Sequence, residues 1–543
     1  MKTCLWAVAL AAVVCVASIT APQSTATVSN LEELRQQRKE AAHRKRRIIY
    51  NNDGDDLNAF IRECKQVTPD EFLSRRTSAV AGTQVDTIFY CTGLCFGILR
   101  YDSKVGDNHV RIALEAGKLP REKAEQFFSK KLDAMQMMIN FCRKNKIEIF
   151  CSMRMNDTHD GSNKLLFSTL KKAHPEYLNG TPEKPPKFGV WSAVDYARPE
   201  IRDLRVRMFQ EACENYDLDG IEMDYFRHAV LFKSHATGTA VSQEERDMMT
   251  DMMRRIRRMT EEVGLKRGRP ILVAVRVPDS VGYCEAMGLE LARWLEEGLV
   301  DILIPGGYFR LNSWETSVEL GHKHGVPVYP SLDESRMSCN WPDKNEAAKI
   351  RNSPACYRAR AAEVWDSGAD GVYMFNFFDP HSPLWQELGD PKTLSGLDAV
   401  YTTSARSDSG IGGKNGLVGG RRFLNRRVAF CPERPLKLMP GRPASVDLRV
   451  GQHVGGEGTR GLAPEVTLQL RVKDLASTDE LAVKLSGQSL VSSTRQAAWL
   501  EYPVKPALVV KGTNRFEITL KAGSTAKPVV EDLLLWVRYG KTR

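Results

Sequence analysis

Residues 217–228 read DLDGIEMDYFRH, which places four carboxylates, an arginine and a histidine in twelve positions of an otherwise apolar, strand-like segment. Successive side chains of a β-strand point to opposite faces, so Ile221 and Met223 face one way and Glu222 and Asp224 the other. Two carboxylates side by side on one face of a buried strand are costly unless they have a role. The segment therefore predicts a strand whose Glu222 and Asp224 belong to a functional site.

Short apolar runs on both sides of this strand alternate with longer amphipathic segments. The eight runs are residues 47–50, 87–90, 147–150, 220–224, 271–275, 300–304, 327–329 and 371–375. The helix-like segments between them include residues 121–145, 199–216, 244–263, 288–298 and 356–367. Strands separated by helices pair in parallel, and eight such units predict an α/β fold, a closed (β/α)8 TIM barrel.

Polar residues gather just after the strands. They occupy residues 51–53, 154–160, 224–228, 276–279, 306–310, 331–336 and 376–379. In a barrel enzyme the carboxyl ends of the strands carry the chemistry, so these segments are expected to converge on one face. A doubly wound sheet would instead need a glycine-rich phosphate turn after its first strand, and residues 51–56 are too acidic for that purpose.

The pattern changes after the barrel. Residues 401–425 are rich in glycine and serine and predict a linker, and residues 426–543 hold short alternating strands that predict an all-β sandwich domain. The barrel is assigned to residues 46–400, preceded by a basic helical lead at residues 27–45.

The first 26 residues predict a signal peptide: Lys2 supplies the positive charge, Leu5 to Val16 the apolar run, and Ala21 or Ala26 a cleavage position. An uncleaved anchor is the alternative, although the run is short for a membrane span. We expect a secreted or periplasmic bacterial protein with no stable membrane span after cleavage.

The formal charge of +10 comes from 77 Lys and Arg against 67 Asp and Glu, with seven of the basic residues in segment 35–47. That segment lacks the interleaved aromatic residues or motif of a nucleic-acid site, so no nucleic-acid partner is predicted. The 12 cysteines include no CxxC pair and no zinc spacing. His159 and Asp160 with His228 could group around a metal, but their spacing is not diagnostic, so neither a metal nor a cofactor is predicted.

Hydrolysis of a glycosidic bond needs two carboxyl groups across the scissile bond. Asp224 is the first catalytic candidate because it ends its strand on the inward face, and Glu222, one layer deeper, would orient it. Alternatively, both belong to buried ion pairs with Arg154 or Arg276. Glu334 is the preferred partner acid, and Asp333, Asp279, Asp157 and Asp379 are alternatives at other strand ends.

The remaining strand-end residues are candidates for substrate binding, since sugars need planar donors and acceptors beside an apolar platform. These candidates are Asp53, Arg154, Asn156, Asp157, His159, Arg227, His228, Arg276, Tyr308, Asp333, Arg336, Asn376 and Asp379. Trp191, Trp314 and Trp341 could stack on sugar faces or pack in the core.

Residues 218–228 resemble the fourth-strand signature of the family-10-like bacterial glycosyl hydrolase-like barrel proteins. Residues 191–200, 298–305 and 368–372 are similar to further segments of that group, and the resemblance spans roughly residues 46–388. It implies a (β/α)8 barrel acting on carbohydrate, often with a C-terminal β-sandwich.

A second family serves as a contrast. The fourth strand of chitinase-type family 18 barrels reads Asp-Gly-x-Asp-x-Asp-x-Glu; this chain aligns Asp219, Glu222 and Asp224 with its first three acids but has Phe226 in place of the final acid. Any general acid should therefore come from another strand.

The sequence as a whole predicts an exported glycoside hydrolase that cleaves O-glycosidic bonds in a poly- or oligosaccharide. Two alternatives remain: a non-catalytic carbohydrate-binding or scaffold protein on a degenerate barrel, and a hydrolase of cell-wall glycan strands. The sequence contains no Gly-x-Ser-x-Gly elbow, no P-loop and no His-Glu-x-x-His motif, which argues against those chemistries.

Overall fold

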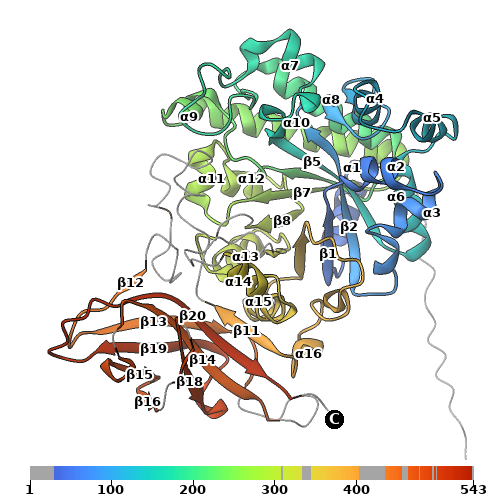
Figure 1. The fold of residues 1–543 in the computed structure, drawn as a ribbon. Coiled ribbons are helices and arrows are strands. Elements are labelled where there is room, and N and C mark those ends of the chain that lie inside the picture. Colours follow the sequence, from blue (N-terminus) through green and yellow to red (C-terminus); the bar gives the residue numbers. More distant parts are fainter. Residues whose placement is uncertain are drawn as a thin grey trace, which may run out of the picture.

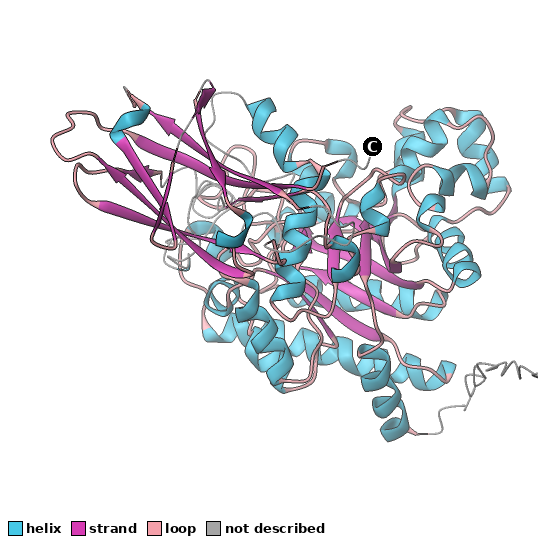
Figure 2. Cartoon of the chain, turned by 90° about the horizontal axis from the view of Figure 1, so that it is seen from below, coloured by secondary structure: helices cyan, strands magenta, loops and turns pink. Residues whose placement is uncertain are grey.

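The protein is described by a computed structural model that covers residues 30–306, 310–332, 344–402, 423, 435–454, 463–475, 477–491, 494–496 and 498–540. Figure 1 shows a barrel of strands surrounded by helices, with a β-rich domain beside it. In the view from below, the barrel strands lie inside a shell of helices and the C-terminal strands form a separate unit (Figure 2). Within these residues, no helix combines the length and apolar character needed to cross a lipid bilayer.

Eight parallel strands form the barrel and confirm the predicted fold class. In chain order they are β1 (Ile48–Asn52), β2 (Val85–Cys95), β5 (Glu148–Asp157), β6 (Gly220–Asp224), β7 (Leu272–Val277), β8 (Ile302–Pro305), β9 (Ser331–Leu332) and β10 (Val372–Phe375). Their spatial order is β8-β7-β6-β5-β2-β1-β10-β9. The Leu303 N–H donates to the Pro327 carbonyl at 3.0 Å and the Tyr329 N–H to the Leu303 carbonyl at 2.9 Å, which brings β8 against the segment before β9.

Helices connect the strands and cover the barrel. Their bounds are α1 (Leu31–Ala42), α2 (Asp56–Glu63), α3 (Pro69–Ser74), α4 (His109–Glu115), α5 (Arg121–Ser129), α6 (Ala134–Asn145), α7 (Thr169–Ala173), α8 (Pro199–Asn215), α9 (Lys233–Thr237), α10 (Gln243–Arg267), α11 (Val281–Met287), α12 (Leu291–Glu296), α13 (Trp314–Lys323), α14 (Lys344–Arg351), α15 (Pro354–Asp366) and α16 (Pro391–Leu394). Two short strands, β3 (Ile98–Leu99) and β4 (Asp107–Asn108), extend the sheet beside β2.

The longest helix, α10, shows why these segments are helical. Ser242 and Glu245 form a capping box at its start, and Gly268 ends it in the left-handed region at φ +74°. The predicted helix at residues 121–145 is instead two helices, α5 and α6. Lys131, between them, has φ +50°, and the Asp133 side chain caps α6 by accepting from the Gln136 N–H at 2.8 Å.

The C-terminal domain is built from two antiparallel sheets. One contains β11 (Ala399–Thr402), β20 (Val529–Arg538), β14 (Glu465–Lys473), β18 (Trp499–Val504), β17 (Thr494–Gln496) and β12 (Leu436–Lys437). The other contains β13 (Pro443–Val450), β19 (Gly512–Leu520), β15 (Leu481–Leu485) and β16 (Gln488–Leu490). Alternate side chains of both sheets, among them Leu468, Phe516 and Leu535, form one core, as a sandwich requires. Of the predicted linker, residues 401, 402 and 423 are described.

The sandwich packs against helices on the outside of the barrel (Figure 1). On the barrel side, Asp366 of α15 binds Arg449 at 2.6 Å and Lys511 at 3.1 Å. Gly451 lies so close to α15 that a Cβ there would stand 2.2 Å from the carbonyl carbon of Ala362. This contact leaves no room for any residue other than glycine, and it anchors the domain to the helical shell.

Candidate active site

The barrel interior is layered along its axis. At the base, Glu148 of β5 accepts from Arg46 at 2.6 Å and from the Thr87 hydroxyl at 2.9 Å. Above it Phe89 and Phe150 stack with ring centroids 4.4 Å apart, inside an apolar cluster. Above the aromatic layer the interior becomes polar again. The first carboxylate there is Glu222.

Glu222 faces the interior at the level of Ser152 on β5 and Ala274 on β7. It is fully buried, and the Tyr373 hydroxyl donates to its Oε1 at 2.6 Å. Burial, reinforced by the negative charge of Asp224, raises the pKa of Glu222 to about 7, while Ser152 and Tyr373 act in the opposite direction. Glu222 therefore keeps its proton at pH values well above those at which an ordinary carboxylic acid ionises.

Asp224 lies one layer nearer the mouth, in register with Arg154 on β5 and Arg276 on β7. Arg276 binds it through two contacts, Nε to Oδ1 at 3.1 Å and Nη2 to Oδ2 at 3.2 Å. The Phe226 N–H also donates to Oδ1 at 3.0 Å, and Arg276 itself lies 3.9 Å from the ring centre of Phe375. The ion pair with Arg276, expected from the sequence as an alternative, is present. These contacts hold the Asp224 side chain in a fixed orientation, with an exposed fraction of 3%.

Arg154 turns away from Asp224 and binds Asp157 at 2.8 Å. The other Asp157 oxygen accepts from the backbone N–H of His159 at 2.9 Å and contacts the His159 Nδ1 at 2.6 Å. Against the effect of burial, Arg154 and His159 hold the pKa of Asp157 well below its usual range. Arg227 completes the cluster, with its Nη2 3.2 Å from the His159 Nε2.

His228 lies beside this cluster. Its Nδ1 accepts from the Thr158 N–H at 3.3 Å, and its ring centre is 5.4 Å from that of His159. Burial lowers the pKa of His228 to about 4, so the ring is neutral at pH 7. Asp157, His159 and His228 offer three ligand atoms within 4.8 Å of one another, the one group of this kind among the described residues. These are the residues that could hold a metal ion.

Two predicted residues at other strand ends are held by their neighbours. Asp53 accepts from Arg76 at 2.7 Å and lies 3.9 Å from Arg154. Asn156 donates to the carbonyls of Val194 and Val230 at 2.9 and 2.7 Å and accepts from the Val194 N–H at 2.9 Å. Its amide therefore ties two loops together.

The eighth strand contributes Asn376 and Asp379. Asn376 has a left-handed backbone at φ +48°, and Asp379 is exposed and accepts from the His381 N–H at 3.1 Å. No contact described here joins either residue to Asp224.

Only some of the candidates for the partner acid lie within the described residues. Glu334, Asp333, Arg336 and Tyr308 lie outside the described residues. Of the alternatives, Asp279 accepts from the backbone N–H groups of Leu311 and Asn312 at 2.8–3.0 Å. Burial raises its pKa to about 6, and the carboxylate anchors the loop after β8. The assignment of Glu334 stays a prediction.

The aromatic candidates differ in exposure. Trp314 is buried, Trp191 is half-buried and lies 5.4 Å from the Phe167 ring centre, and Trp341 is outside the described residues. Phe226, which replaces the acid of the family 18 pattern, packs in the core.

Tyr373 and Ser152 are the residues that sequence reasoning missed. Both face Glu222, but they come from the eighth and third strands. Alternation alone shows that Tyr373 points into the barrel. Which carboxylate it meets depends on the stagger between strands 151 positions apart in the chain.

No protein-family model and no curated protein matches this chain. Among solved structures, an α-L-fucosidase isoenzyme 2 from Paenibacillus thiaminolyticus has a TM-score of 0.40 at 14% identity, over 64% of this chain and 48% of its own. The PgaB (BpsB) glycoside hydrolase domain from Bordetella bronchiseptica has a TM-score of 0.40 at 10% identity, over 64% of this chain and 98% of its own. An α-amylase from Anoxybacillus has a TM-score of 0.37 at 10% identity, over 89% of this chain and 99% of its own.

The chain thus spans about half the length of the fucosidase. These neighbours are glycoside hydrolases, but at such identities and TM-scores none of their properties transfers to this chain. The barrel fold is therefore assigned from the strand pairing alone, and membership of the family-10-like group stays a prediction.

Proposed function

We propose that the protein is an exported glycoside hydrolase acting on a poly- or oligosaccharide, with Asp224 as its catalytic carboxylate. Adjacent inward positions of β6 hold two carboxyl groups in contrasting environments, and this observation carries the proposal. Burial and the neighbouring charge of Asp224 favour the protonated Glu222, whereas Asp224 is bound through two contacts to the Arg276 guanidinium. Environments that separate the proton affinities of neighbouring acids are typical of acid–base sites.

In this mechanism Asp224 stabilises the positive charge that develops at the anomeric carbon, either by attacking that carbon or by activating water. Both roles need a negatively charged carboxylate, and the Arg276 guanidinium lies beside it. Glu222 lies a layer below and acts as a positioning residue, since its neutral form adds no second negative charge beneath Asp224. A carboxyl group from another loop protonates the leaving oxygen, and Glu334 is our candidate.

A second function is favoured by one observation. Both Asp224 oxygens are already engaged and the side chain is 3% exposed, as in a purely structural ion pair. A barrel with that pair and no acid would bind carbohydrate without cleaving it.

The substitution Asp224→Asn separates the two functions. If Asp224 is catalytic, the release of reducing ends from a panel of α- and β-linked polysaccharides should fall by at least about 10²-fold, the scale of losing one positioned acid–base group. The matched control is Asp301→Asn. Asp301 is also buried and bound to an arginine, Arg257 at 2.8 Å, but it precedes β8 at the opposite end of the barrel.

Hydrolysis should survive in the folded fraction of Asp301→Asn. Equal activity of Asp224→Asn and the wild-type chain would remove Asp224 from the mechanism. Export is tested separately, by N-terminal sequencing of the full-length product secreted by a bacterial host, which should begin near residue 22 or 27.

A further inference from the structure

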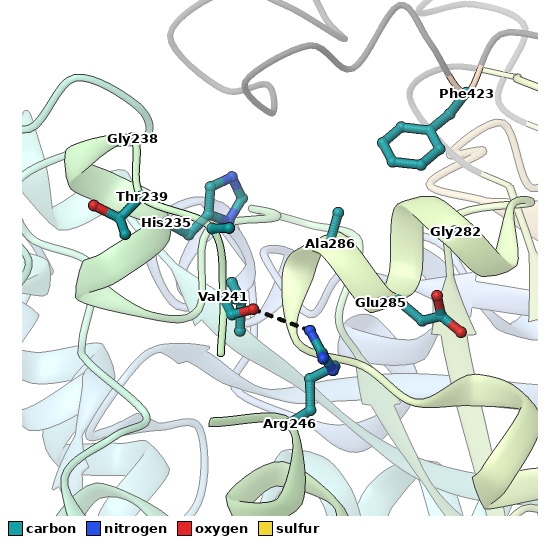
Figure 3. A pocket seen from close by; sticks show the side chains of 10 residues that line it. His235, Gly238, Thr239, Val241, Arg246, Gly282, Glu285, Ala286 and Phe423 are labelled. Carbon is teal, nitrogen blue, oxygen red and sulfur yellow. Dashed lines mark hydrogen bonds between the residues drawn. The ribbon is translucent and has the colours of Figure 1, made fainter. Parts of the chain in front are cut away.

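A cavity of about 510 Å³ lies between the connections that follow β6 and β7, the two strands that carry Asp224 and Arg276. Its walls come from α9 and the residues after it, from α11, and from Phe423 (Figure 3). The volume is within the range of small-molecule sites, about 300–1,000 Å³. Connections after barrel strands lie at the carboxyl face, so the cavity belongs to the same end of the barrel as Asp224.

His235 is the unusual group in this cavity. Its exposed fraction is 2%, and neither ring nitrogen has a hydrogen-bond partner among the described residues. Its ring neighbour is Phe188, with centroids 6.4 Å apart, which offers no hydrogen bond. Buried polar groups in native proteins are nearly always paired, because an unpaired one costs about 1–3 kcal/mol. A side chain that lines a cavity and, within the described part of the chain, has no hydrogen-bond partner for either ring nitrogen is suited to binding a ligand.

The chemistry of the walls selects the ligand. Burial lowers the pKa of His235 to about 4, so the neutral ring offers one donor and one acceptor, as a hydroxyl group requires. The Arg246 guanidinium is already bound to the Val241 carbonyl at 3.0 Å and the Gln243 side chain at 2.8 Å. Glu285 adds a negative charge to the lining, so a free anion is disfavoured.

Apart from Thr239, the remaining lining is apolar. Ala286 and Val241 lie on the cavity wall, and the ring of Phe423 stands across from His235 in Figure 3. A Cβ on Gly282 would come within 3.0 Å of the Phe423 ring, so glycine at that position sets how closely the ring packs on α11. A pyranose ring, with apolar faces and hydroxyl groups on its edge, matches an aromatic face opposite a neutral imidazole.

We propose that this cavity is a second carbohydrate site, which binds one neutral sugar unit through His235 and the Phe423 ring. This inference deepens the proposed function and rests on it, because it takes the ligand to be a unit of the glycan that reaches Asp224.

The test uses the full chain and three sugars as probes: glucose, galactose and N-acetylglucosamine. Saturation-transfer NMR reports binding of each sugar, and the ring ¹⁵N signals of His235 report its place. We expect at least one of the three to bind and to shift the His235 signals in the wild-type chain and in Asp224→Asn. His235→Phe, which keeps a ring but removes both nitrogens, should weaken that binding at least about tenfold, equivalent to 1.4 kcal/mol.

Ala286→Trp, which fills the cavity while leaving His235 in place, provides the second variant, and circular-dichroism melting confirms that each variant is folded. The proposal is overturned if none of the sugars shifts the His235 signals, if sulfate shifts them and no sugar does, or if binding survives in both variants. Hydrolysis that depends on Asp224, without sugar binding in this cavity, would overturn this inference alone. Binding in the cavity without such hydrolysis would overturn the proposed function alone.

Discussion

The two ends of the barrel both contain carboxylates bound by other side chains, but the carboxylates have different roles at each end. At the base an aspartate at the start of a strand accepts a backbone N–H from a neighbouring strand or its lead-in. Asp219 accepts from Ile149, Asp301 from Val273 and Asp370 from Val328, each at 2.7–2.8 Å. A basic side chain completes each site: Arg143 and Arg269 for Asp219, Arg257 for Asp301 and His322 for Asp370.

At the mouth, Glu222 and Asp224 lie within the strand and bind side chains of other strands, Tyr373 and Arg276. Within the part of the chain that the structure describes, neither accepts a backbone N–H from a neighbouring strand. The base carboxylates therefore accept backbone N–H groups near the starts of the strands, whereas the mouth carboxylates face the barrel interior. This division runs through residues 217–228: Asp217 and Asp219 belong to the base, and Glu222 and Asp224 to the mouth.

The largest effect on stability is expected when Arg276 is replaced by methionine. This change leaves the Asp224 charge buried without its partner, which should cost about 3–5 kcal/mol in the free energy of unfolding by urea. At the base, Arg257→Met should cost less, about 1–3 kcal/mol, because Asp301 keeps the Val273 N–H at 2.7 Å and Arg38 at 3.3 Å.

The double variant Asp224→Asn with Arg276→Met should recover part of the loss, since no buried carboxylate is then left unpaired. Equal losses for Arg276→Met and Arg257→Met would contradict the division between mouth and base.

The next effect is a pH dependence at the mouth. The pKa of Glu222 is about 7 in the folded chain and 4.5 for an ordinary glutamate, so the folded state binds this proton more tightly. Its stabilising effect is complete below pH 4.5 and is lost as the pH rises to about 7, a change of about 3 kcal/mol. Glu222→Gln, which stays neutral, should match the wild-type chain at pH 4.5 and be more stable at pH 8.

The difference between the two proteins is the quantity to measure, by urea unfolding at several pH values. The buried His228 and His235 have lowered pKa values and change stability in the opposite sense, but equally in both proteins. Parallel stability curves from pH 4.5 to 8 would show that Glu222 is not protonated in the folded chain.

A smaller effect is expected from Asp219→Asn at the base. Asparagine can still accept the Ile149 N–H but loses the charge that pairs with Arg143 and Arg269, so the loss should be about 1–2 kcal/mol. Asp217→Asn, at a more exposed position of the same network, should cost about 0–1 kcal/mol. The hydrolytic rate per folded molecule should be unchanged in both, and a loss like that of Asp224→Asn would place the base in the mechanism.

The sequence was sufficient for the barrel because seven of the eight strands coincide with a predicted apolar run, whereas the seventh run, residues 327–329, lies just before β9. Alternation in β6 also correctly placed Glu222 and Asp224 on one face. It could not show that Asp219 accepts a hydrogen bond from the backbone of the sheet, since the donor is the Ile149 N–H of another strand. The pairing of Glu222 with Tyr373 is similarly non-local. The break at Lys131 was missed because lysine carries no signal for a left-handed backbone.

The smallest effect concerns metal ions at Asp157, His159 and His228. Both Asp157 oxygens already accept hydrogen bonds, from Arg154 and from the backbone N–H of His159, and Arg227 lies beside the cluster. A divalent cation would have to displace these donors and approach two guanidinium groups, which is electrostatically unfavourable. We therefore expect EDTA and added Zn²⁺ to leave the melting temperature and the hydrolytic rate unchanged. A rise in melting temperature with Zn²⁺ that disappears in His228→Gln would show that the mouth binds a metal.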